Sequence, residues 1–160
     1  MLGHLTVLCG AWIGFAAVPL AQEGSGVSGA AVVAARQASL DMSSIIFRAM
    51  GDAMKAGREA KSQGYPAAAL AKWARALPRM FPSGTGKGET STNSQALSAI
   101  WEDGVGFGRA AADYADAAAR LAALAAANDT AGFTRQLGEV DHACSSCHAR
   151  YKEGAQGPPK

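Results

Sequence analysis

The sequence is short of charged residues, cysteines and strand-forming residues. Only 18% of its 160 residues are charged, and the formal net charge at pH 7 is +2. Because no run of lysines and arginines appears either, the composition predicts no nucleic-acid partner. Three cysteines are too few for a disulfide scaffold. Alanine and glycine are abundant instead, so we expect an all-α protein with a single domain.

The most informative stretch is Cys144-Ser145-Ser146-Cys147-His148, close to the C-terminus. It matches C-x-x-C-H, the attachment motif of a c-type haem. Two thiols add across the two vinyl groups on one edge of a haem, and the histidine that follows gives an imidazole nitrogen to the iron. On a helix these three side chains share one face, because they are three and four residues apart. We therefore predict that Cys144 and Cys147 bind haem c and that His148 is the metal ligand.

Other uses of the two cysteines remain as alternatives. His142 would add a fourth donor for zinc, although structural zinc sites normally draw their ligands from two separated pairs. A thioredoxin-like dithiol would need a preceding strand and a βαβ pattern, and the sequence indicates neither. A disulfide between Cys144 and Cys147 is the third alternative.

The N-terminal residues 1–21 have most features of a secretory signal peptide. The segment from Leu5 to Ala21 is uncharged and mostly apolar, ends in small residues and precedes a polar stretch. No lysine or arginine occurs before Arg36, which leaves open a start codon upstream. An uncleaved anchor is the alternative, although the stretch is near the lower limit for a spanning helix. We predict cleavage near Ala21, a periplasmic location, and one domain over residues 22–160, from which Cys9 would be missing.

Apolar residues recur at three- and four-residue spacing in four segments, the pattern of helices packed in a bundle. The expected helices cover roughly residues 28–57, 65–81, 94–127 and 131–152. Residues 83–95 are rich in Gly, Ser and Thr, and we expect them to form a loop. A loop of this length usually covers another part of the protein or is mobile. Since both haem cysteines fall on the apolar stripe of the last helix, we expect an antiparallel up-down four-helix bundle with haem inside one end. His142 falls off that stripe and is expected to be exposed.

Arg36 interrupts the apolar stripe of the first helix and has two interpretations. It is either a snorkelling side chain at the end of the bundle or a partner of a haem propionate, because a guanidinium matches a carboxylate.

Four amphipathic helices with C-x-x-C-H on the last one resemble the cytochrome c′ family, the class II c-type cytochromes. The resemblance covers about residues 31–152. Besides the haem motif, the similar stretches are Arg36-Gln37-Ala38-Ser39-Leu40, Leu77-Pro78 with Phe81-Pro82, Ile100-Trp101 and Tyr151-Lys152.

The resemblance implies roles for three further residues. Arg36 matches the family arginine near a propionate, and Leu40 matches the distal position that faces the sixth coordination site of the iron. Since leucine cannot donate electrons to iron, we expect a five-coordinate, high-spin haem with an apolar distal pocket. Lys152 stands where many members have arginine beside the proximal histidine, which keeps the positive charge but loses the planar fork.

Two functions are compatible with these features. The first is electron transfer in the periplasm by a covalently bound haem that cycles between ferric and ferrous iron. The alternative is binding of nitric oxide or carbon monoxide at the distal site, which an apolar pocket without a hydrogen-bond donor would favour. No acid–base pair or nucleophile is evident at the predicted site, so we do not expect an enzyme. The redox partner is not identified, and the apolar second helix permits a homodimer.

Overall fold

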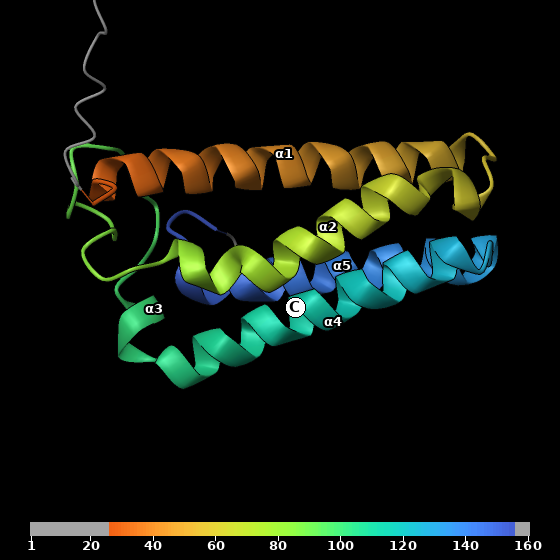
Figure 1. The fold of residues 1–160 in the computed structure, drawn as a ribbon. Coiled ribbons are helices and arrows are strands. Elements are labelled where there is room, and N and C mark those ends of the chain that lie inside the picture. The colour runs from red at the N-terminus through yellow and green to blue at the C-terminus, as the bar shows by residue number, and fades with distance from the viewer. Residues whose placement is uncertain (1–25, 156–160) are drawn as a thin grey trace, which may run out of the picture.

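Four long helices form a bundle in the computed structural model, which describes residues 26–155 (Figure 1). The predicted signal peptide and Cys9 therefore lie outside the described residues. Within these limits no helix is long and apolar enough to cross a membrane. The all-α, four-helix prediction is confirmed. The long helices are α1 (Gly29–Lys55), α2 (Gly64–Ala76), α4 (Gly104–Ala126) and α5 (Thr130–Tyr151), and the short ones are η1 (Ala60–Gln63), η2 (Leu77–Met80) and α3 (Ala99–Glu102).

Short polar side chains set the starts of three long helices. Ser28, Asp103 and Asp129 each accept a hydrogen bond from the backbone N–H three residues further on, at 3.2, 3.0 and 2.8 Å respectively. Such caps satisfy N–H groups that have no partner inside the helix. The caps at Ser28 and Asp129 agree with the starts predicted for the first and last helices.

The prediction of one continuous helix over residues 94–127 is wrong. The helix breaks at Asp103, whose backbone has φ −112° and ψ 56°, and α3 lies at an angle to α4 (Figure 1). The Asp103 carboxylate caps α4 and also accepts hydrogen bonds from the Tyr151 hydroxyl and from Arg150, both at 2.9 Å. A side chain that offers the backbone an alternative partner competes with helix continuation, so contacts with α5 account for this break.

Small residues along α4 let two neighbouring helices approach it closely. Ala111, Ala118 and Ala125 are buried on this helix. The helix packs extensively against both α2 and α5, whereas α1 and α5 meet only lightly. Because α1 and α5 stay apart over most of their length, space remains between them.

Candidate functional site

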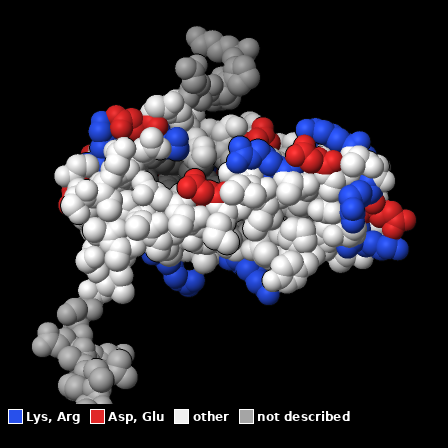
Figure 2. Space-filling view, turned by 90° about the horizontal axis from the view of Figure 1, so that it is seen from above, with Lys and Arg blue, Asp and Glu red and all other residues white. Residues whose placement is uncertain are grey.

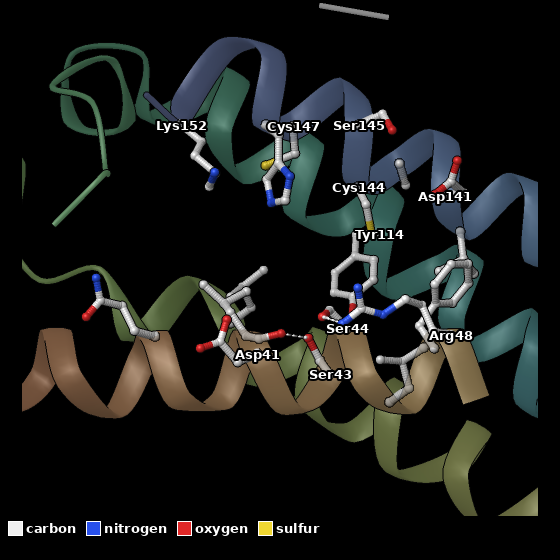
Figure 3. Close-up of a pocket in the computed structure, with 18 of the residues that line it drawn as sticks. Asp41, Ser43, Ser44, Arg48, Tyr114, Asp141, Cys144, Ser145, Cys147 and Lys152 are labelled. Carbon is white, nitrogen blue, oxygen red and sulfur yellow. Dashed lines mark hydrogen bonds between the residues drawn. The ribbon is translucent and has the colours of Figure 1, made fainter. Parts of the chain in front are cut away.

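A cavity of about 760 Å³ lies between α1 and α5, with residues of α2 and α4 also in its lining (Figure 3). This volume is in the range of about 300–1,000 Å³ that is usual for ligand and cofactor sites. The structure brings Leu40 of α1 to the same cavity as Cys144, Cys147 and His148 of α5. Four of the five residues predicted from the sequence therefore line one space.

The two cysteines are half-buried free thiols on one face of α5. Burial raises the pKa of Cys144 to about 11 and also raises the pKa of Cys147. Both side chains line the cavity between α1 and α5.

The pKa of His148 is lowered, first by desolvation and then by the positive charge of Lys152. The shift favours the neutral imidazole, which is the form that binds a metal. His148 and Lys152 are one helical turn apart, and the Lys152 backbone N–H donates to the carbonyl of His148 at 3.0 Å.

The donors of the C-x-x-C-H motif fit a haem better than a metal ion alone. Two thiols and one imidazole face a cavity large enough for a cofactor. His142 is exposed, as predicted, and lies in a different hollow, between α4 and α5. In residues 26–155 no group of three or more His, Cys, Asp and Glu side chains is placed to hold a metal ion. The residues present therefore fit a covalently bound haem.

The cavity wall is apolar over much of its area, but it also contains the hydroxyl groups of Tyr114, Ser43, Ser44 and Ser145. Tyr114 of α4 points toward Ser43 of α1 (Figure 3). Burial raises the pKa of Tyr114, and a hydrogen bond with Ser43 partly offsets that rise. Ser43 itself donates to the carbonyl of Leu40 at 2.8 Å. The expected apolar pocket therefore has polar groups in its wall, among them the hydroxyls of Tyr114 and Ser43.

Arg36 is not among the residues that line the cavity. Its side chain is 3% exposed, which excludes a snorkelling arginine. The guanidinium donates to the carbonyl of Met80 at 3.0 Å, to Oγ1 and the carbonyl of Thr85 at 3.0 and 2.8 Å, and to Oγ of Ser94 at 3.0 Å. It also lies over the Phe81 ring, 4.4 Å from the centroid. A contact between Arg36 and a propionate stays a prediction.

One end of the cavity is lined by amides and a cation. Gln37 donates to the carbonyl of Asn93 at 2.8 Å, and Gln95 and Lys152 lie at the same cavity. Figure 3 shows Lys152 and Cys147 directed into the same space from α5 and the residues just after it. These N–H donors and the ammonium group suit the carboxylates of a cofactor.

Comparison with known proteins gives consistent results. A family model described as cytochrome C′ matches residues 31–152, more than half of the chain. Cytochrome c-554 of Cereibacter sphaeroides is 35% identical over 96 residues, which cover 59% of this chain and 71% of that protein.

Two solved structures share the fold. A cytochrome c′ with ligand-controlled dimer dissociation has a TM-score of 0.75 and 22% identity, over 80% of this chain and 98% of that chain. A ferrous variant of cytochrome c prime from Alcaligenes xylosoxidans with bound NO has a TM-score of 0.70 and 23% identity, over the same shares of the two chains.

Proposed function

The chain belongs to the cytochrome c′ family, and from this premise we propose that it is a periplasmic electron carrier. Its cofactor is haem c, the covalently bound, iron-containing group of cytochromes c. The observation that supports the proposal most strongly is the common cavity of Cys144, Cys147, His148 and Leu40. The haem iron supplies a one-electron couple between its ferric and ferrous states.

Each of these residues has a distinct role in the proposal. Cys144 and Cys147 would form the two thioether bonds, and His148 would give its imidazole to the iron. Leu40 has no lone pair and would supply no sixth ligand, so a haem held by these residues would be five-coordinate. Phe47, Leu70 and Leu77 add apolar side chains to the lining of the same cavity.

Binding of nitric oxide or carbon monoxide is the second proposed function. Leucine at the distal position supports it, because a side chain that cannot ligate iron leaves room for a diatomic molecule. The similar cytochrome c prime from Alcaligenes xylosoxidans holds NO in its ferrous form. Electron transfer and gas binding are compatible, since one haem serves both, and neither amounts to enzymatic turnover.

The periplasmic location rests on the sequence of residues 5–21 and on the chemistry of the cofactor. The apolar segment is typical of an export signal. Covalent haem attachment of this kind is expected on the outer side of the bacterial cytoplasmic membrane. The two observations point to the same compartment.

Optical spectra of the exported protein, with and without carbon monoxide, test the proposal. We expect a high-spin spectrum that shifts when carbon monoxide is added to the ferrous form. A low-spin spectrum that ignores carbon monoxide would indicate a sixth protein ligand and remove gas binding. Absence of haem from a properly matured preparation would contradict both functions.

We also propose that the protein forms a homodimer through the outer side of α1. Met42 and Ile45 are 62% and 59% exposed there, whereas the sequence only permitted a dimer through its apolar second helix. Figure 2 views this side of the molecule and shows a broad uncharged area between charged groups. Spacings of three and four residues suit packing against a second helix. The exposed stripe consists of Ala31, Ala35, Ala38, Met42, Ile45 and Ala49.

Ile45→Glu should convert the dimer to a monomer, because it places a carboxylate in the apolar stripe of each copy. Light scattering after gel filtration measures the change as a halving of the mass. Val105→Glu is the matched control, since Val105 is 81% exposed on α4, away from this stripe. Equal masses for the wild type and both variants would contradict the interface.

A further inference from the structure

Both terminal nitrogens of Arg36 donate hydrogen bonds to residues in the segment that follows α2. None of its acceptors is a carboxylate: two are backbone carbonyls and two are hydroxyl groups. Burial of a guanidinium is costly unless its N–H groups are paired. Desolvation lowers the pKa of Arg36 from its ordinary value, which agrees with the absence of an ion pair among the described residues. A buried cation placed in this way organises the segment around it.

Ser94 links Arg36 to both ends of the loop through hydrogen bonds. Its Oγ accepts from Arg36 at 3.0 Å and from the backbone N–H of Ala96 at 3.3 Å, and it donates to the carbonyl of Thr85 at 3.0 Å. The backbone N–H of Lys87 donates to the carbonyl of Ala96 at 2.8 Å. The two ends of the loop at residues 83–96 are thus tied together over the guanidinium of Arg36.

The end of this loop is paired with the end of α5. The backbone N–H of Leu97 donates to the carbonyl of Tyr151 at 3.0 Å, and the N–H of Glu153 donates to the carbonyl of Gln95 at 2.9 Å. These two hydrogen bonds flank Lys152, whose backbone is extended (φ −122°, ψ 132°). The backbone on either side of Lys152 is therefore fixed from outside α5.

We infer that Arg36 is a positioning residue, which holds the loop at residues 83–96 so that its pairing with the end of α5 fixes Lys152 beside His148. The inference rests on the proposed role of His148 as the iron ligand. The charge of Lys152 acts on the side of the haem where this histidine binds. Arg36 would thus fix the position of the Lys152 charge beside His148 without itself contacting the iron or its ligand.

Two variants test this relay in the holoprotein. Arg36→Gln removes the anchor, and Ser94→Ala removes one of its acceptors at a residue that does not line the cavity. Both should speed hydrogen exchange of the Leu97 and Glu153 amides, the first by tenfold or more, because these hydrogen bonds open locally. Both should also shift the iron–histidine stretching frequency of the ferrous form in the same direction.

Arg79→Gln is the matched control, because Arg79 is an exposed arginine beside the same segment. It should leave both amides at the wild-type rate. The inference is overturned if Arg36→Gln alters the haem spectrum while Ser94→Ala leaves the two amides and the stretching frequency unchanged, since Arg36 then acts on the cofactor directly. If Arg36→Gln does not fold, Ser94→Ala and Thr85→Val decide the matter by the same criteria. Failure of the wild type to attach haem would count against the proposed function alone, because every hydrogen bond of the relay joins protein groups.

Discussion

Replacing Cys144 and Cys147 together by serine should abolish covalent haem attachment. A serine hydroxyl does not add to a haem vinyl group, and both thiols face the cavity in which the haem would lie. The helix should persist, because serine differs from cysteine by one atom and neither side chain is fully buried. The measurement is the mass of the denatured protein, which should fall by the mass of one haem.

The two residues between the cysteines provide the control for this experiment. Ser145→Ala with Ser146→Ala changes the same turn of α5 and leaves both thiols in place. This variant should retain its full complement of covalent haem. Covalent haem in the double serine variant would refute the assignment of the motif.

Leu40→Met should convert the iron from high-spin to low-spin and lower the affinity for carbon monoxide by at least about tenfold, or about 1.4 kcal/mol. A methionine thioether at this position can supply the sixth ligand that leucine lacks. The exchange conserves volume, so the cost in folding free energy should stay below about 1.5 kcal/mol. Optical spectra and carbon monoxide titration measure the two effects.

Leu40→Ile separates the effect of ligation from that of repacking. Isoleucine is apolar and has no donor atom, so the iron should remain high-spin and continue to bind carbon monoxide. If Leu40→Met left the spin state unchanged, Leu40 would not face the iron.

The sequence was sufficient for features that depend on neighbouring residues. The starts of α1 and α5 follow from Ser28 and Asp129, each of which caps an N–H three residues ahead. The C-x-x-C-H motif is also local, and helical spacing alone places its three donors on one face. Such features need no knowledge of the rest of the fold.

Two features escaped prediction because they depend on residues far away in the chain. The break at Asp103 involves hydrogen bonds from Arg150 and Tyr151, 47 and 48 residues further on. Arg36 finds its partners 44 to 58 residues away, in a segment without periodic pattern. Periodicity showed that Arg36 lies on an inward face, but it could not identify what the side chain meets there.

The light contact between α1 and α5 has a consequence for how the chain folds. Helices α2, α4 and α5 pack extensively on one another through α4 and bury their apolar side chains without help from a cofactor. Part of the inner side of α1 packs on this core through Met50, and another part, around Leu40 and Ser43, lines the cavity. We therefore expect three helices to form the stable nucleus, with the first helix in sequence the last to settle. The cofactor would be bonded only to α5, but it would also supply the apolar surface on which the part of α1 around Leu40 packs.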